Sequence, residues 1–289
     1  MISFYHNELL EIDKKILEVE VGEIPQIFAP IPLDVFGYLY LLHGNEYPNI
    51  KLFLPTMASK EVQLAWTGAS DKTLLLQSLS FVKSVVNFAE KMGISDLHNV
   101  SLLDFGCGWG RILRLFLKYI PESRLFGVDP MNESLEQCIL HKVKGNLMKS
   151  DYLCRSLPFG EMKFDIVIAM SVFTHLSRRA MDEALRTIRS RVSDNALFVV
   201  TVRPTEYWEI HKQHADSNLD VEGCEKEHNT KGFVFRPHAG VPPIEGDVTF
   251  GDTSMTLEFI SENWHGWKVV GTDVSLLDSM QIIIFLKPC

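Results

Sequence analysis

The sequence predicts an α/β fold, a doubly wound and mostly parallel sheet with helices on both faces. Two observations support this prediction. From about residue 100 onward, short apolar segments alternate with longer segments of helical character. Some of the short segments, such as residues 166–169 and 196–200, contain apolar side chains only. This pattern is typical of strands that are buried on both faces of a parallel sheet.

The composition narrows the functional classes. With 46% hydrophobic and 22% charged residues among 289, the chain resembles ordinary globular proteins. Its net charge of −9 argues against a nucleic-acid partner, because binding to phosphates needs clustered Lys and Arg. No apolar run approaches the ~20 residues of a membrane span, and no secretory leader opens the chain. Five scattered cysteines, an odd number, indicate reduced thiols, so we expect a cytoplasmic protein without a membrane partner.

Residues 1–69 are expected to form an N-terminal elaboration. Apolar residues from Leu9 to Val19 recur at helical spacing, which predicts an amphipathic helix. The prolines between residues 25 and 55 predict an irregular layer after it. This layer is either a passive cover of the sheet or a lid over the ligands, and Trp66, beside a flexible turn, is the candidate lid residue.

Residues 70–289 are expected to form the main domain. A helix is predicted from Ser70 or Asp71 to Met92. Strands are predicted near residues 100–105, 124–129, 145–150, 164–170 and 196–203, with helices over 109–119, 132–142 and 177–191. Residues 204–252 are polar and rich in His, Glu and Gly, so we expect an irregular insert that builds the substrate pocket or only packs on itself or on a partner subunit. A helix over 254–264 and strands over 267–270 and 281–286 complete the domain.

A glycine-rich turn follows the first of these strands. The chain reads Asp104-Phe105-Gly106-Cys107-Gly108-Trp109-Gly110-Arg111, and Asp129 ends the next strand nineteen residues after Gly110. Together these features predict a site for an adenine nucleoside. The glycines let backbone N–H groups approach the ligand closely, and the acid accepts hydrogen bonds from the ribose hydroxyls.

The spacing within the turn indicates which cofactor binds. A dinucleotide fingerprint reads Gly-x-Gly-x-x-Gly, whereas this turn reads Gly-x-Gly-x-Gly. The carboxylate of Asp104 would oppose a pyrophosphate, but it suits a cationic amino group or sulfonium. In these residues the chain resembles the class I S-adenosylmethionine-dependent methyltransferases. The resemblance covers about residues 70–289 and continues in Leu125-Phe126-Gly127-Val128-Asp129-Pro130, in Asp151-Tyr152 before Leu157-Pro158-Phe159, and in Phe164-Asp165-Ile166-Val167-Ile168-Ala169-Met170-Ser171-Val172-Phe173.

The resemblance implies a Rossmann-like sheet of seven strands with a reversed C-terminal hairpin. It also implies S-adenosylmethionine as the cofactor and S-adenosylhomocysteine as the product. In the family, the acid at Asp129 holds the ribose, and Asp151 with Tyr152 meets the edge of the adenine. The residues expected around the cofactor are Trp66, Asp104, Gly106, Cys107, Gly108, Gly110, Arg111, Asp129, Pro130, Asp151, Tyr152 and Met170. Within this set Cys107 is expected to pack inside the turn, and Arg111 to pair with the cofactor carboxylate or with Asp104, or to lie in solvent.

The residues after the fourth strand bear on the chemistry. Met170-Ser171 stands where catechol-type enzymes have a magnesium-binding acid, and no Asn-Pro-Pro-Tyr, Asp-Pro-Pro-Tyr or Pro-Cys signature follows. We therefore expect metal-independent, in-line methyl transfer to an oxygen or nitrogen of a small molecule. His175 is the candidate base, and a packed or helix-capping histidine is the equal alternative. The histidines of residues 204–252 are too loosely spaced to predict a metal site.

Other functions stay open from the sequence alone. The chain could bind S-adenosylmethionine or S-adenosylhomocysteine without chemistry, as a regulatory or scaffold subunit. It could also methylate a protein or a nucleic acid instead of a small molecule. The sequence names neither the acceptor nor the oligomeric state, and a homo-oligomer is compatible with it.

Overall fold

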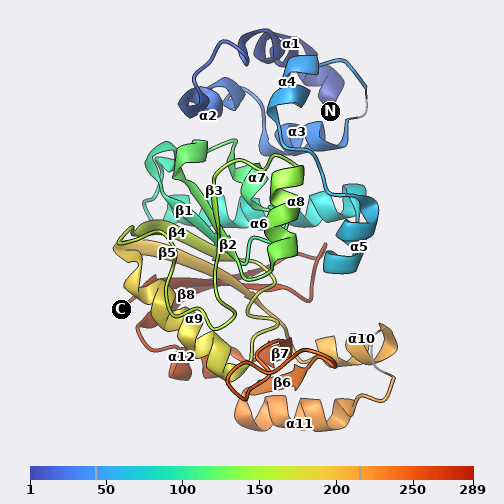
Figure 1. Cartoon of the computed structure of the whole chain (residues 1–289), viewed down its shortest axis with the longest axis vertical. Helices are drawn as coiled ribbons and strands as arrows, with labels where there is room; N and C mark the ends of the chain where they lie inside the picture. Colours follow the sequence, from blue (N-terminus) through green and yellow to red (C-terminus); the bar gives the residue numbers. More distant parts are fainter. Residues whose placement is uncertain (43, 215–216) are drawn as a thin grey trace. The chain divides into compact units, whose positions relative to one another are not determined.

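The computed structural model describes residues 1–42, 44–214 and 217–289. The chain forms two compact units, Met1–Lys149 and Ser150–Cys289 (Figure 1). The domain boundary that we expected near residue 70 stays a prediction. No helix among the described residues combines the length and the apolar character needed to cross a bilayer.

Short helices fill the N-terminal part of the first unit. They are α1 (His6–Lys15), α2 (Ile24–Phe28), α3 (Leu33–Tyr38), α4 (Pro48–Phe53) and α5 (Lys60–Thr67), and the long α6 (Asp71–Lys91) follows them. The prediction of an irregular layer was wrong, because Pro25 and Pro48 stand in the first turns of α2 and α4. Proline is tolerated there, since the first N–H groups of a helix have no partner within the helix.

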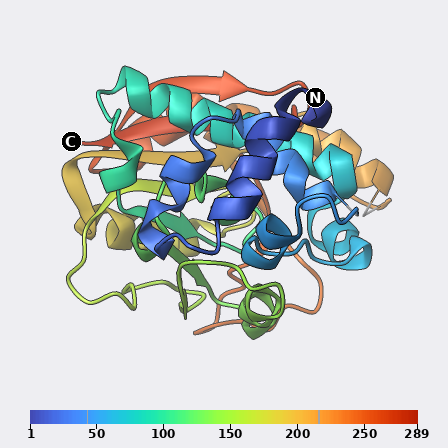
Figure 2. The ribbon, with the colours of Figure 1, turned by 90° about the horizontal axis from the view of Figure 1, so that it is seen from above.

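Two pairs of helices hold this N-terminal part together. α1 lies beside α4, and α3 lies beside α6 (Figure 2). A buried carboxylate joins the first pair: Asp13 Oδ1 accepts a hydrogen bond of 2.8 Å from the backbone N–H of Ile50, in the first turn of α4. A carboxylate at the N-terminus of a helix is favoured by the helix dipole. The predicted amphipathic helix is therefore present as α1, and its C-terminal end is Lys15 instead of Val19.

Three parallel strands complete the first unit. They are β1 (Leu102–Phe105), β2 (Leu125–Asp129) and β3 (Asn146–Lys149), and α8 (Asn132–Leu140) connects the last two. The predicted helix over 109–119 is reduced to α7 (Leu113–Phe116). Before α7, the carbonyl of Trp109 accepts from the Arg114 guanidinium, and the carbonyl of Gly110 accepts from both the guanidinium and the backbone N–H of Arg114.

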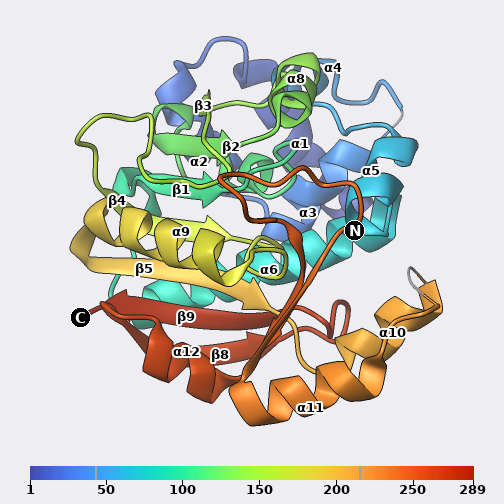
Figure 3. The same cartoon turned by 60° about the horizontal axis from the view of Figure 1, so that its bottom comes forward.

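The second unit holds the remaining strands of the sheet. β4 (Phe164–Ala169) and β5 (Val192–Val202) are parallel, and the antiparallel pair β8 (Trp267–Val274) and β9 (Ile282–Pro288) joins β5 through β9 (Figure 3). The seven-stranded sheet has the order β3-β2-β1-β4-β5-β9-β8. The predicted fold class, including the reversed hairpin, is confirmed. Two helices of this unit, α9 (Arg178–Ser190) and α12 (Leu257–Asn263), also lie where helices were expected.

The insert after β5 has regular structure, so the prediction of an irregular segment was wrong. Its elements are α10 (Tyr207–His214), α11 (Val221–Lys231), β6 (Phe233–Pro237) and β7 (Gly251–Met255). The insert has a small apolar core of its own, in which Trp208, Cys224 and Val234 are fully buried. Among the described residues, Val221 also belongs to this core, and Tyr207 and Leu219 pack against it. These few apolar residues are spread through a mostly polar segment, which is why the sequence appears polar. Residues 254 and 255, which were predicted to begin a helix over 254–264, belong to β7 instead.

Candidate functional site

The glycine turn of the first unit follows β1. Gly108 and Gly110 have positive φ angles of 53° and 76°, a conformation that favours glycine. A Cβ on Gly110 would lie 2.6 Å from Cγ1 of Val143, so the chain itself requires a glycine there. A Cβ on Gly108 would meet no described atom within 4 Å. The turn therefore has open space beside Gly108.

Four N–H groups of this turn are already bonded within the protein. Gly106 and Cys107 donate to the Val128 carbonyl, Gly110 donates to the Cys107 carbonyl, and Gly108 donates to Oδ2 of Asp129, all over 2.8 to 3.0 Å. These four N–H groups are therefore not free for a phosphate. The expected approach of the turn's backbone to the ligand stays a prediction.

Asp129 stands at the carboxyl end of β2, as predicted. Besides the bond from Gly108, its Oδ1 accepts a hydrogen bond of 3.0 Å from the N–H of Met131. Burial raises the pKa of this carboxyl, and the bonds from Met131, Gly108 and Ser134 oppose the rise. A carboxylate has about four lone-pair positions, so Asp129 keeps capacity for further donors. Pro130, next to it, is half-buried.

Asp104, in β1, is the most unusual carboxyl of the first unit. It is 2% exposed, and its Oδ2 has no hydrogen-bond partner within the described part of the chain. Burial raises its pKa to about 7; the charge of Arg111 and an N–H of Leu113 lower it, and Asp129 raises it further. A buried acceptor without a donor costs about 1–3 kcal/mol, and more when it is charged. A cationic ligand group would remove this penalty.

Other predicted residues of the first unit take structural positions. The Cys107 thiol is buried, and its pKa is raised well above the ordinary value by its hydrogen bond with Cys138 and by burial. It therefore has no thiolate character, in agreement with a packing residue. Trp66 is 36% exposed on α5, and its role as a lid residue stays a prediction.

Sequence reasoning missed Arg114. This guanidinium is 1% exposed, lies 4.6 Å over the Trp109 ring, and donates to the carbonyls of Trp109, Gly110 and Thr56. It has only carbonyl, sulfur and ring partners among the described contacts, and burial lowers its pKa to about 10. It ties the glycine turn to the N-terminal segment at Thr56. An arginine inside an otherwise apolar segment was the only signal for this role.

The predicted residues of the second unit differ in burial. Asp151 and Tyr152 are exposed, and Met170 is buried. Ser171, directly after Met170, has a φ of 59°, which is strained for a residue with a side chain. Its N–H donates to Thr201 Oγ1 over 2.7 Å, and its hydroxyl accepts from Gln281 Nε2 over 3.1 Å. Such strain is typical of functional turns.

His175 has partners on both ring nitrogens. Nδ1 lies 2.7 Å from the Gly251 carbonyl, which can only accept, so Nδ1 carries the proton. Nε2 then accepts from the Arg203 guanidinium over 3.1 Å. Burial and the Arg203 charge lower the pKa of His175 to about 3. The geometry fits the packed alternative better than the base, and the role of His175 as a base stays a prediction.

Asp252, on β7, is the centre of a polar cluster that sequence reasoning did not assemble. Its carboxylate accepts from Arg203 and, over 2.8 Å, from the Tyr207 hydroxyl, and its Oδ2 lies 2.7 Å from His238 Nε2. Burial opposes ionisation, but Arg203, His175, His238 and Tyr207 outweigh it and lower the pKa of Asp252 to about 2. Arg203 and Asp252 are 49 positions apart and His175 is farther still along the chain, so no local sequence pattern predicts this cluster. We call His175, Arg203, Tyr207, His238 and Asp252 the Asp252 cluster.

Part of this cluster has the composition of a metal site. Ligand atoms of His175, His238 and Asp252 lie within 4.8 Å of one another. However, Arg203 donates both to Asp252 and to His175. A divalent cation at this point would face the guanidinium charge and would have to displace its hydrogen bonds. The donor set therefore does not fit a metal ion.

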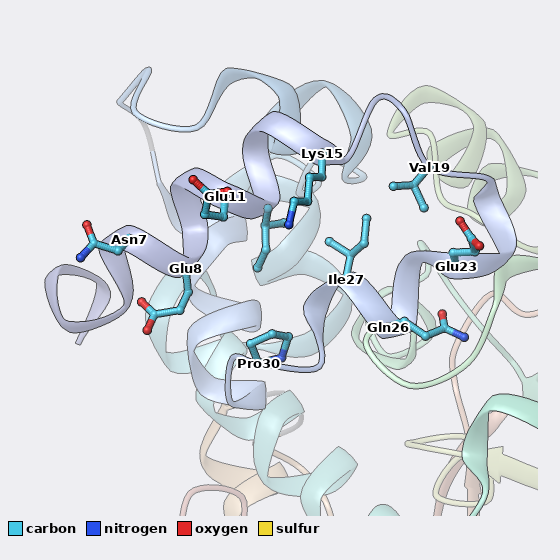
Figure 4. Close-up of a pocket in the computed structure, with 10 residues that line it drawn as sticks. Asn7, Glu8, Glu11, Lys15, Val19, Glu23, Gln26, Ile27 and Pro30 are labelled. Atoms are coloured by element: carbon cyan, nitrogen blue, oxygen red, sulfur yellow. The ribbon is translucent and has the colours of Figure 1, made fainter.

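A cavity of about 690 Å³ lies elsewhere, between α1 and α2 (Figure 4). Ile12, Ile27 and Pro30 give it an apolar lining, and Glu8, Glu11 and Glu23 stand at its rim. None of the predicted site residues lines this cavity. Its volume alone does not make it the candidate site. The glycine turn in the first unit and the Asp252 cluster in the second, each taken by itself, are the stronger candidates.

The glycine turn, β2 and β4 all lie in a segment that matches a known family. Residues 103–198 match the family described as a methyltransferase domain. They make up about a third of the chain, and over them the chain is similar to methyltransferase domains. An uncharacterized methyltransferase of Schizosaccharomyces pombe is 36% identical over 84 residues, which are 26% of this chain and 30% of that protein. The match thus spans less than a third of that relative's length.

A solved structure shares the fold of this chain. The magnesium protoporphyrin IX methyltransferase from Synechocystis PCC 6803, with bound SAH, aligns with 80% of this chain and 93% of its own, at a TM-score of 0.50 and 15% identity. A SAM-dependent methyltransferase from Anabaena variabilis aligns with 82% and 97%, at a TM-score of 0.48 and 13% identity. The first likeness shows a common fold.

Proposed function

We propose that this chain is an enzyme that transfers a methyl group from S-adenosylmethionine to an oxygen or nitrogen of a small molecule. The methyltransferase domain over residues 103–198 supports the reaction class. The observation that carries the cofactor assignment is the state of Asp104. A buried carboxylate oxygen without a described donor stands beside a turn in which the N–H groups of all three glycines are bonded within the protein. A phosphate would need the reverse, free N–H groups and no carboxylate.

The residues of the first unit fit this cofactor. Oδ2 of Asp104 would accept a hydrogen bond from the ammonium of the methionine part. The remaining lone pairs of Asp129 would accept from the ribose hydroxyls. The open space beside Gly108 leaves room for the ligand at the turn. Contacts of the cofactor with Arg111, Pro130, Trp66, Asp151, Tyr152 and Met170 belong to the same proposal.

The cofactor supplies a methyl group on a sulfonium sulfur, and the neutral thioether is a good leaving group. The protein then has to hold the acceptor atom in line with the methyl group, about 3 Å from it, and to exclude water. Positioning of this kind is worth up to about 7–11 kcal/mol of the barrier. A proton acceptor is needed only when the acceptor atom carries a proton that must leave.

Calorimetric titration tests the cofactor assignment. We expect heat of binding with S-adenosylmethionine and S-adenosylhomocysteine, and none with a nicotinamide dinucleotide. Binding of the dinucleotide alone would contradict the proposal.

Two glycine variants make a matched test of the turn. In Gly108→Ala the new methyl group enters space that the chain leaves open, so we expect weaker cofactor binding with a small loss of stability, about 1 kcal/mol for the positive φ. In Gly110→Ala the methyl group collides with Val143, so we expect a larger loss of stability. A Gly108→Ala protein that binds S-adenosylmethionine like the wild type would place the ligand elsewhere.

A transfer assay tests the activity itself. The protein is incubated with methyl-labelled S-adenosylmethionine and a metabolite extract, and labelled products are separated. We expect a labelled small molecule, absent with Asp104→Asn. Tight cofactor binding without any labelled product would favour a regulatory or scaffold protein, and label on protein would favour a protein methyltransferase.

A further inference from the structure

The Asp252 cluster contains two histidines in contrasting states. Both ring nitrogens of His175 have partners, and its side chain is 20% exposed. His238 is 38% exposed, and only its Nε2 is bonded, to Oδ2 of Asp252 over 2.7 Å. Within the described residues, Nδ1 of His238 has no hydrogen-bond partner. Because a carboxylate can only accept, Nε2 carries the proton, and Nδ1 presents a lone pair.

The carboxylate behind His238 is held firmly in the ionised form. Arg203 and the Tyr207 hydroxyl donate to Oδ1, which leaves Oδ2 to His238. His211 also faces this carboxylate, with Nδ1 3.5 Å from Oδ2. A histidine oriented by an ionised carboxylate can accept a proton at its outer nitrogen, because the imidazolium formed is stabilised by the charge behind it.

Backbone hydrogen bonds place this pair at the carboxyl ends of two sheet strands. β7 runs along the loop after β4: Gly251 N–H donates to the His175 carbonyl over 2.9 Å, and Thr253 N–H to the Thr174 carbonyl over 2.8 Å. Met255 N–H donates to the carbonyl of Arg203, which directly follows β5. Ligands of open α/β sheets bind outside the carboxyl ends of the strands. By this rule, His238 lies on the side of the second unit's strands where ligands bind.

We propose that His238 is the general base of the methyl transfer, that Asp252 is its positioning residue, and that the acceptor is a hydroxyl group. This proposal rests on the function proposed above. In the step, the acceptor oxygen forms a bond to the methyl carbon, and the carbon–sulfur bond breaks with its electron pair going to sulfur. The hydroxyl proton moves to Nδ1 of His238. The products are a methyl ether, the neutral thioether and a protonated imidazole.

The hydroxyl class follows from what a base contributes. A carboxylate is already ionised at neutral pH, and a neutral amine attacks through its own lone pair. A hydroxyl oxygen becomes a strong nucleophile only as its proton leaves, so it gains most from a positioned base, typically about 10²–10⁴-fold. His238 is such a positioned base, because Asp252 bonds its Nε2 while Arg203 and Tyr207 hold Asp252 ionised.

The test uses the full chain, methyl-labelled S-adenosylmethionine and the acceptor found with the metabolite extract. We expect His238→Gln to lower kcat about 10²–10⁴-fold and, at saturating S-adenosylmethionine, to remove the acid limb of the pH profile of kcat, with cofactor affinity unchanged. His265→Gln, at an exposed histidine of the same unit, is the control and should keep the activity of the wild type. A His238→Gln enzyme within about threefold of wild-type kcat, or with the same pH profile, would overturn the base assignment.

Two further measurements separate the parts of the proposal. Nitrogen NMR of labelled histidine should show His238 protonated at Nε2, and Asp252→Asn should change that tautomer; protonation at Nδ1 in the wild type would overturn the proposal. The labelled product should resist mild alkali, as an ether does. Label released by alkali, or found on nitrogen, would show that the acceptor is not a hydroxyl group. Failure to bind S-adenosylmethionine at all would instead contradict the proposed methyltransferase function.

Discussion

Asp104 of the first unit and Asp252 of the second are both 2% exposed, yet their carboxyl groups have opposite properties. Asp104 has an oxygen without a described partner, and burial raises its pKa to about 7. Asp252 accepts from Arg203, Tyr207 and His238, and its pKa is lowered to about 2 despite burial.

The difference shows that burial alone does not decide the state of a carboxyl group. Desolvation raises the pKa at both sites, and the hydrogen-bond donors and charges around each carboxyl group decide its final pKa. A carboxylate whose hydrogen-bond donors all come from the chain itself has a structural role. One that lacks a donor is paired by a ligand or stays partly protonated, and such perturbed groups gather at functional sites.

The largest effect should come from removing the well-paired carboxylate. Asp252→Ala leaves the buried Arg203 guanidinium without its anion, so we expect a loss of about 3–5 kcal/mol in the free energy of unfolding. Urea denaturation measures it. Asp104→Asn is the comparison and should not destabilise the protein at neutral pH. Equal losses in the two variants would break the contrast between the sites.

Cofactor affinity should show the reverse order. Asp104→Asn removes the charge-assisted acceptor for the ligand ammonium, which is worth about 1.5–3 kcal/mol, so we expect the Kd of S-adenosylmethionine to rise about 10–100-fold. Calorimetry measures the change. An unchanged Kd would show that the orphaned oxygen of Asp104 does not face the cofactor.

The affinity of the wild type should depend on pH through the same carboxyl. Binding requires ionised Asp104, whose pKa is about 7 before binding. Below this value the proton must first leave, so the Kd should rise about tenfold per pH unit on acidification and level off above pH 7. Asp104→Asn should lack this slope, and a wild-type Kd that is flat from pH 5 to 8 would contradict the assignment.

The stability of the protein without cofactor should respond to pH in opposite senses at the two sites. The pKa of Asp104 is raised on folding, so its contribution is present below about pH 4 and is lost as the pH rises through about 7. The pKa of Asp252 is lowered, so its contribution is present above about pH 4 and is lost as the pH falls towards 2. Thermal unfolding should therefore find Asp104→Asn more stable than the wild type at pH 8, with little difference at pH 4.

The smallest effect is expected at His175. Because its pKa is about 3, this histidine is neutral throughout the working range of pH. His175→Gln should leave the acid limb of the pH–rate profile in place and change kcat far less than His238→Gln does. Loss of that limb in the His175 variant would restore His175 as the base.

The sequence predicted the sheet well and the added segments poorly. Apolar runs such as residues 166–169 are local signals, and each became a strand of the sheet. The helices of the N-terminal part and of the insert bury few apolar residues each, so their periodicity is weak. At the glycine turn, the positions of Asp104 and Asp129 were predicted correctly at the ends of β1 and β2, but the bonding of the N–H groups was not.

The sequence by itself determined the strand–turn–helix order, the glycine spacing and the two acids of the first unit, because these depend on neighbours along the chain. Only the tertiary structure decided that Oδ2 of Asp104 lacks a described donor and that Arg114 donates to the glycine turn. It also decided that the neighbours of Asp252 bond both ring nitrogens of His175 but only Nε2 of His238. Hydrogen bonds and desolvation act between groups that are close in space, and residues tens of positions apart carry no common pattern in the sequence.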